Sequence, residues 1–202
     1  MAPRPIAAAL ALCSSLALVS CGGSEEVSAI EATIVASAKT ESPADCTRLH
    51  TQAYLEQAFK LEDGAAVEVC EESAGDSIPD DPGTVTVFDV DVDGDAATAG
   101  ARFVGGGNDG QTMRYGLVRR GGAWKLDRLL RFIRLDAEKL VLEFRRAGMY
   151  EATSREDVEF VDCVTDLLEQ MDDEELEAFF VDYGPDETRA MAESCISGSQ
   201  AL

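Results

Sequence analysis

Four short segments of alternating apolar and polar residues, separated by glycine-containing turns, constrain the fold of this chain most strongly. They span, in order, residues 84–92, 96–104, 111–119 and 123 to about 130. Asp93-Gly94 separates the first pair, and Gly121-Gly122 separates the last pair. Alternation with period two is typical of half-buried strands, and Asp-Gly and Gly-Gly pairs favour tight hairpins. The segments therefore predict an antiparallel meander.

The segments before the meander are helical by pattern. Apolar residues recur at helical spacing between Ser24 and Ala38. Ser42, followed by proline, is a typical helix start, and Thr51 can cap a further turn of helix. The stretch Val67–Cys70 suits either a short extended piece or the start of a helix.

Helices are also expected after the meander. Asp136 is placed to cap a helix that runs to about Ala147, where Gly148 would end it. Ser154 and the pair Asp172/Glu175 predict the starts of two more helices, and Tyr183-Gly184-Pro185 separates them from a last one. An antiparallel sheet with helices gathered on it belongs to the α+β class.

The first twenty residues read as an export signal and not as part of the fold. Residues 1–20 combine Arg4 with the apolar run Ile6–Val19, which is too short for a membrane-spanning helix. The run ends in Leu-Val-Ser-Cys21, which resembles the lipobox of bacterial lipoproteins. That resemblance implies cleavage before Cys21, a diacylglycerol on its thiol and attachment to the membrane, with residues 21–26 as a short tether. An ordinary secreted protein with a chance cysteine is the alternative.

The chain is strongly acidic. It holds 39 acidic and 17 basic residues, and its net charge of −22 becomes −23 once Arg4 is removed. Nucleic acid is not an expected partner, because nothing in this balance offsets repulsion by phosphates. The acidity suits solubility, and salt adaptation would also produce it.

Four cysteines remain after Cys21 and the signal are set aside. They are Cys46, Cys70, Cys163 and Cys195. An even number in an exported chain indicates two disulfides, for which three pairings exist. Because two cysteines lie before the meander and two after it, the predicted pairs are Cys46–Cys70 and Cys163–Cys195.

A family resemblance covers about Val27 to Leu130. The segments 94–99 and 117–127, together with the lipobox and the Cys46-x-x-Leu-x-Thr stretch, resemble small actinobacterial lipoproteins of the nuclear transport factor two-like superfamily. The resemblance implies a curved sheet wrapped around helices as a cone with an internal pocket. We expect this α+β domain at residues 27–135, and an appended C-terminal helical module at 136–202.

The sequence offers little catalytic or metal-binding chemistry. Asp89-x-Asp-x-Asp93-Gly94 copies half of a calcium loop, but its twelfth position is Gly100, where a glutamate is needed. The chain has no CxxC pair and a single histidine, His50. A histidine in this position is more often a surface or packed residue than a catalytic base. No metal and no cofactor are expected, and no catalytic residues are assigned. An enzyme is the least favoured class.

The cone pocket is where the superfamily places its function. The candidate lining residues here are Tyr54, Met113, Tyr115 and Trp124, although such residues more often form plain core. Catalytic relatives, such as ketosteroid isomerase-like enzymes, place acids and tyrosines in this pocket.

Seven of the 17 basic residues lie within positions 114–134, and only Asp127 opposes them there. They are Arg114, Arg119, Arg120, Lys125, Arg128, Arg131 and Arg134. The segment 136–202 in turn holds 19 acids and five bases. Two interpretations stay open: the basic residues face and balance the acidic module, or they face anionic headgroups or wall polymers.

Three functions follow in order of preference. The first is a lipid-anchored, non-catalytic envelope protein that binds a protein or wall-polymer partner. The second is a carrier or sensor of a small apolar ligand held in the cone pocket. The third is an isomerase- or hydratase-like enzyme, which would need two convergent titratable groups in a polar pocket.

Overall fold

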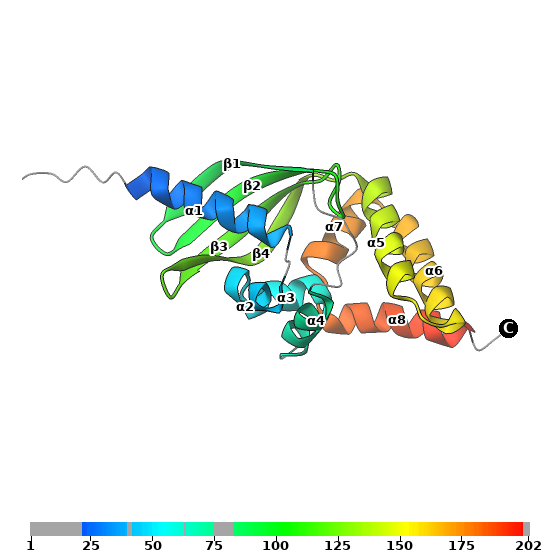
Figure 1. The fold of residues 1–202 in the computed structure, drawn as a ribbon. Coiled ribbons are helices and arrows are strands. Elements are labelled where there is room, and N and C mark those ends of the chain that lie inside the picture. The colour runs from blue at the N-terminus through cyan, green and yellow to red at the C-terminus, as the bar shows by residue number, and fades with distance from the viewer. Residues whose placement is uncertain (1–21, 40–41, 63, 75–82, 200–202) are drawn as a thin grey trace, which may run out of the picture.

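The computed structural model describes residues 22–39, 42–62, 64–74 and 83–199. Within them the chain forms a mixed α+β fold with one four-stranded antiparallel sheet and eight helices (Figure 1). The elements are α1 Gly22–Ser37, α2 Pro43–Leu49, α3 Gln52–Phe59, α4 Ala65–Ser73, β1 Thr84–Asp93, β2 Ala96–Val104, β3 Thr112–Arg120, β4 Ala123–Arg134, α5 Ala137–Glu151, α6 Arg155–Glu169, α7 Asp173–Val181 and α8 Pro185–Ser199. The predicted α+β class is confirmed.

The sheet is a simple meander in the order β1-β2-β3-β4, as predicted. Gly94 adopts a positive φ of 62° in the β1–β2 turn, so the calcium-like aspartate pattern forms a strand and its hairpin. The prediction that the last strand ends near Leu130 is wrong, since β4 continues to Arg134. Three register shifts opposite β3 let β4 bend and keep pairing as far as Thr112.

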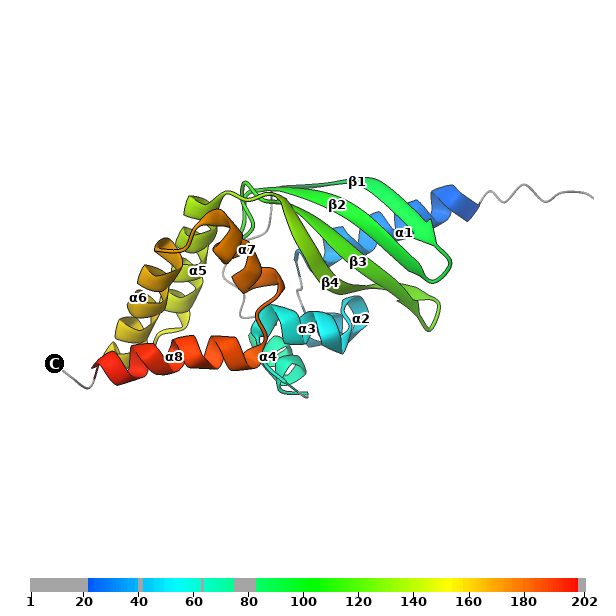
Figure 2. The ribbon, with the colours of Figure 1, turned by 180° about the vertical axis from the view of Figure 1, so that it is seen from behind.

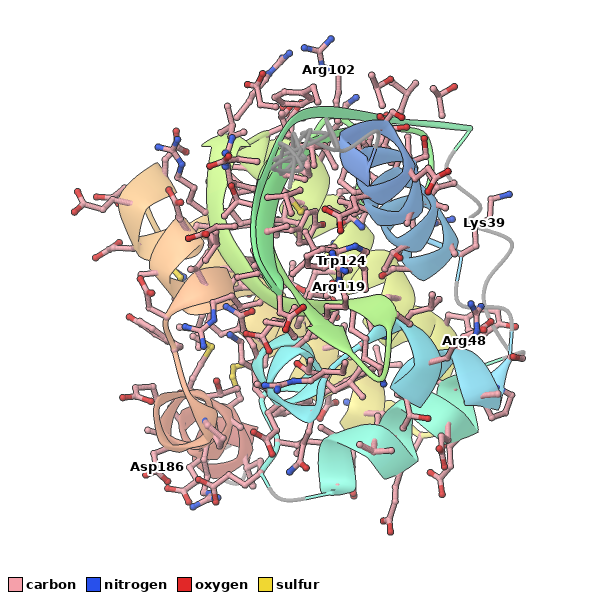
Figure 3. All side chains as sticks on the ribbon, turned by 90° about the vertical axis from the view of Figure 1, so that its left-hand side faces the viewer. Lys39, Arg48, Arg102, Arg119, Trp124 and Asp186 are labelled. Atoms are coloured by element: carbon pink, nitrogen blue, oxygen red, sulfur yellow. A yellow bond between two sulfur atoms is a disulfide. The ribbon has the colours of Figure 1, made fainter. Side chains whose placement is uncertain are left out.

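The inner face of the sheet is packed with its own side chains and with α1. Ile30 and Ile34 of α1 are buried against alanines of β2 and larger residues of β3 and β4. Figure 3 shows α1 enclosed by the curving strands, with Arg119 and Trp124 in the enclosed space. The Arg119 guanidinium lies 4.6 Å above the Trp124 ring and pairs with Glu26 of α1. One contiguous core therefore occupies the concave side.

The helices before the sheet begin where local capping predicts. Ser42 forms a capping box with Asp45, and the Thr51 hydroxyl accepts a hydrogen bond from the Tyr54 amide. The stretch around Cys70 is helical, within α4, and a disulfide joins it to Cys46 of α2 as predicted. Residues 22–26, expected as a tether, are the start of α1.

The C-terminal helices start at the predicted caps Asp136, Ser154 and Asp172. The expectation that Gly148 ends the first of them is wrong, because α5 runs on to Glu151. Gly148 instead allows α5 and α6 to pack closely. A Cβ at this position would lie 2.9 Å from a methyl group of Val161 on α6.

The C-terminal helices pack against the sheet and are linked to one another by a disulfide. The predicted Cys163–Cys195 disulfide is present and links α6 to α8. Phe180 of α7 packs edge-on against Phe132 of β4, with ring centroids 6.3 Å apart. Figure 2 shows α5 to α8 gathered beyond one end of the sheet, away from the β1–β2 and β3–β4 turns and the start of α1.

The two disulfides indicate in which cellular compartment the chain is found. Two disulfides are typical of proteins outside the reducing cytoplasm. None of the helices in the described ranges has both the length and the apolar character that crossing a bilayer requires. The predicted signal at 1–20 and the predicted lipidation site Cys21 lie outside the described residues.

Candidate functional site

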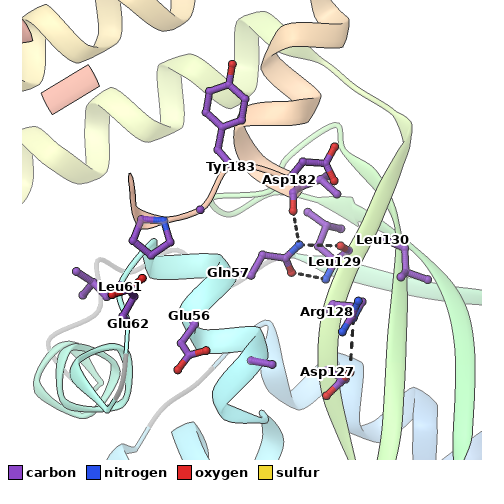
Figure 4. Close-up of a pocket in the computed structure, with 14 residues that line it drawn as sticks. Glu56, Gln57, Leu61, Glu62, Asp127, Arg128, Leu129, Leu130, Asp182 and Tyr183 are labelled. Carbon is purple, nitrogen blue, oxygen red and sulfur yellow. Dashed lines mark hydrogen bonds and ion pairs between the residues drawn. The ribbon is translucent and has the colours of Figure 1, made fainter. Parts of the chain in front are cut away.

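The larger of the two openings described here is a groove of about 540 Å³ between α3, β4 and the end of α7 (Figure 4). One wall is α3 with the residues that follow it, the second is the edge strand β4, and the third is the connection from α7 to α8. The lining residues are Ala53, Glu56, Gln57, Leu61, Glu62, Asp127, Arg128, Leu129, Leu130, Val181, Asp182, Tyr183, Gly184 and Pro185.

Gln57 holds the three walls of the groove together. Its side-chain amide donates to the carbonyls of Leu129, at 2.9 Å, and Val181, at 2.7 Å. Its oxygen accepts a hydrogen bond from the Leu129 amide at 2.7 Å. Because these contacts satisfy backbone groups on the edge of β4, that edge is closed to a further strand along this stretch.

Lys60 makes a second link to the helical module. Its ammonium donates to the carbonyls of Phe180 and Tyr183, both at 3.0 Å, where α7 ends. A cation in this position complements the negative end of the helix dipole. Burial lowers the pKa of Lys60 to about 8, and the nearby Asp182 carboxylate acts in the opposite direction. Lys60 therefore joins parts of the fold and is not free to bind a ligand.

The charge on the groove is acidic. Four carboxylates line it, and the one guanidinium beside them, that of Arg128, lies 3.6 Å from Asp127. The carboxylates belong to Glu56, Glu62, Asp127 and Asp182. Apolar side chains such as Leu61 and Leu130 lie between them. A ligand with basic and apolar side chains would complement this surface.

The smaller opening, of about 250 Å³, contains the only histidine of the chain. The His50 Nε2 atom lies 2.6 Å from the Ser37 hydroxyl, and Nδ1 lies 3.2 Å from the Cys46 carbonyl. A carbonyl can only accept, so the neutral ring carries its proton on Nδ1 and accepts the Ser37 proton at Nε2. The Tyr54 ring stacks on His50 at 4.9 Å.

Ser37 and His50 are placed like a nucleophile and its general base. The third group of such an arrangement, a carboxylate that orients the base, is not bonded to the ring. A backbone carbonyl, and not a carboxylate, accepts the hydrogen bond from the imidazole. This carbonyl and the Asp45 carboxylate favour the imidazolium, but the cost of burial is larger. Burial lowers the pKa of His50 to about 4, which keeps the ring neutral at pH 7 and makes it a weak base. The geometry favours a structural hydrogen bond that joins α1 to the C-terminal end of α2.

The four predicted pocket residues are not gathered around one opening. Tyr54 lines the smaller pocket, and burial raises its pKa to about 12. Met113, Tyr115 and Trp124 are buried in the core beneath the sheet and line neither opening. The Tyr115 hydroxyl lies 2.9 Å from the Met113 sulfur, and burial raises the pKa of Tyr115 well above its usual value. The inner face is thus filled where the resemblance implies a cavity.

Sequence reasoning missed the groove residues. Glu56, Glu62 and Asp182 belong to separate segments, and no motif or spacing connects them before the chain folds. The only local signal is their position near the ends of predicted helices. As for metals, the described part of the chain contains no group of three or more histidines, cysteines and acids placed to hold an ion.

Comparison of the chain with protein-family models, with curated protein sequences and with solved structures gives no significant match in any of the three. The functional argument therefore depends on the geometry of the two openings and of the surfaces around them.

Proposed function

We propose that this chain is a lipid-anchored, non-catalytic interaction module of the bacterial cell envelope. One observation carries the proposal: the inner face of the sheet is filled by its own side chains, whereas the larger of the two openings described above is an acidic surface groove between two parts of the fold. An apolar carrier needs an enclosed cavity, and an isomerase needs convergent titratable groups. A surface groove suits a partner segment.

The partner class follows from the charge of the groove. Its four carboxylates would repel an anionic wall polymer and attract a protein segment with lysine, arginine and apolar side chains. The lipobox-like sequence that ends at Cys21 supports lipid attachment, and the two disulfides support an envelope location. The proposed relationship to the nuclear transport factor two-like superfamily is supported by the curved antiparallel sheet around α1.

Photocrosslinking in intact cells tests the proposal. A photoreactive residue replaces the exposed Ala53 on the groove wall, and the crosslinked partner is identified by mass spectrometry. Charge reversal in the groove, Glu62→Lys with Asp182→Lys, should abolish the crosslink. The matched control, Glu68→Lys with Glu72→Lys on α4, makes the same change in net charge outside the groove and should preserve it. No crosslink, or equal loss in both variants, would reject the groove as the binding site.

Native mass spectrometry of the exported chain separates this function from the carrier. The smaller pocket, with Leu55, Ala58 and Phe59 on its walls, is the place where an apolar ligand could sit. An interaction module should show a bare mass, four hydrogens lighter than the reduced chain because of its two disulfides. A retained adduct of roughly drug-like size would favour the carrier.

A further inference from the structure

No helix of the described residues lies over the outer face of the sheet. Figure 2 shows all four strands from this side, with α1 behind them. The register places residues on this face in cross-strand rows. Three of these rows are Asp91–Thr98–Gly116–Arg128, Phe88–Gly100–Arg114–Arg131 and Thr86–Arg102–Thr112–Arg134. Nearby apolar side chains are exposed as well, Val104 by 55% and Ile133 by 43%.

Five arginines cluster on this face, which we call the arginine face. They are Arg102, Arg114, Arg128, Arg131 and Arg134. Figure 3 shows Arg102 on the outside of the sheet, away from the space that holds Trp124. The acids on this face lie on the edge strand β1, at Asp91 and Asp93, near the β1–β2 turn. A concentration of guanidinium groups is unusual on a chain with a net charge of −22.

The helical module does not neutralise these arginines. Among the described residues, no ion pair within 4.0 Å joins any of the five to an acid of 136–202. Arg128 has only Asp127, at 3.6 Å, and Arg114 donates to the Thr98 hydroxyl at 2.8 Å. Direct pairing of these five arginines with the acidic module is thus not seen in the described residues, although Arg128 shares the groove with Asp182. Their charge is directed to solvent.

We infer that the arginine face docks on the anionic lipid headgroups of the membrane that holds the anchor. Guanidinium groups bind phosphate through paired hydrogen bonds, and their aliphatic stems cover neighbouring apolar surface. Phe88 packs on Gly100, and Leu130 lies over Gly116, so apolar groups lie between the arginines. Such a mixture of basic and apolar side chains suits the interfacial layer of a bilayer.

The start of α1 lies at one end of the sheet and most of the arginines lie toward the other, so the arginine face would dock with the sheet lying along the membrane. The helix begins at Gly22, directly after Cys21, and its N-terminus lies at the hairpin end of the sheet (Figure 1). The inference rests on the proposed lipid attachment at Cys21, which would hold the domain at high effective concentration beside the headgroups. The anionic membrane would repel the acidic helical module, which favours an orientation with the arginine face toward the membrane. Arg128 and Leu130 also line the interaction groove, so the arginine face and the groove meet along the edge of β4.

Vesicle flotation of an unlipidated chain tests the docking by itself. Residues 21–202 with Cys21→Ser are exported behind an ordinary secretory signal and mixed with phosphatidylcholine vesicles, with or without phosphatidylglycerol. The chain should float only with the anionic vesicles, and salt should weaken its binding. Arg114→Glu with Arg131→Glu should weaken binding by about thirtyfold or more, since each arginine near an anionic surface contributes about a factor of five. The control, Arg155→Glu with Arg189→Glu on the helical module, makes the same change in net charge and should change binding less than twofold.

Three outcomes would overturn the inference. They are no flotation, equal flotation with neutral and anionic vesicles, and equal loss in the two double variants. Binding to soluble polyglycerol phosphate without binding to vesicles would also overturn it, in favour of a wall polymer. Lipid attachment at Cys21 is tested separately, by the mass of the N-terminal peptide of the native protein. A chain without lipid and a chain that does not dock can therefore be distinguished.

Discussion

The side-chain amide of Gln57 binds both backbone groups of Leu129. It donates to the carbonyl at 2.9 Å and accepts from the amide at 2.7 Å, as a neighbouring strand would. Gln111 makes the same paired contact with the backbone of Asp136, at 2.9 and 2.8 Å, where β4 leads into α5. Two glutamines therefore complete the hydrogen bonding of β4 and of its exit, and they fix the helical module against the sheet.

Replacing Gln57 by leucine should destabilise the fold. The change keeps the size of the side chain but leaves the backbone groups of Leu129 and the carbonyl of Val181 without this partner. We expect a loss of about 1–3 kcal/mol in the free energy of unfolding, measured by urea denaturation. The matched control is Gln52→Leu, whose exposed side chain binds only Glu56 and whose effect should stay within about 0.5 kcal/mol. Equal effects of the two changes would contradict the role of Gln57.

Replacing Gly148 by alanine should also destabilise the fold, although alanine is the better helix former by about 1 kcal/mol. The new methyl group would lie 2.9 and 3.0 Å from the two methyl groups of Val161, and overpacking of this kind costs about 1–3 kcal/mol. Val161→Ala in the same chain should relieve the contact, so the double variant should be more stable than the sum of the two single effects. Additive effects in this double-mutant cycle would show that the helices do not approach closely here.

Local signals account for the parts of the fold that the sequence predicted. The caps at Ser42, Thr51, Asp136, Ser154 and Asp172 all form, because each depends on a side chain and a backbone group only two or three residues apart. The hairpins and the two disulfide pairs were predictable for the same reason: turn residues and segment order are visible in the sequence.

The features that the sequence did not predict depend on distant partners. Strand β4 extends beyond Leu130 because β3 offers backbone groups opposite it, and Gly148 continues a helix because Val161 of α6 packs on it. The groove required α3, β4 and the end of α7 to meet, and no single segment carries a signal for that. The arginines were visible in the sequence, but which of them share a face depended on the register shifts in β4.

Removing the Cys163–Cys195 disulfide should free α8. This helix packs mainly along α6, and the disulfide is the covalent link between the two, with a sequence separation of 32 residues. Cys163→Ser with Cys195→Ser should cost about 3–4 kcal/mol in the chain-entropy model. The Arg189 side chain is already exposed, but trypsin cleaves an unfolded backbone, so loosening of α8 should allow cleavage after Arg189, which limited proteolysis with mass spectrometry would detect. Cys46→Ser with Cys70→Ser removes the other disulfide and should leave Arg189 protected. Cleavage at Arg189 in that control as well would show that α8 depends on the whole fold.

Because His50 is buried, its protonation should lower the free energy of unfolding as the pH falls. Burial lowers its pKa from 6.5 to about 4, so between these values the unfolded chain binds a proton that the folded chain does not. The contribution of His50 to stability is therefore complete above pH 6.5 and falls as the pH drops to about 4, by on the order of 3 kcal/mol.

Because the chain has one histidine, its ring signals in an NMR titration need no assignment by mutation. In the folded protein they should not shift until the pH approaches about 4. The carboxylates also destabilise the fold in acid, so the stability measurement compares the wild type with His50→Gln, whose pH profile should lack the His50 contribution. A ring that titrates near 6.5 in the folded protein would show that water reaches the smaller pocket, and would restore His50 as a candidate base toward Ser37.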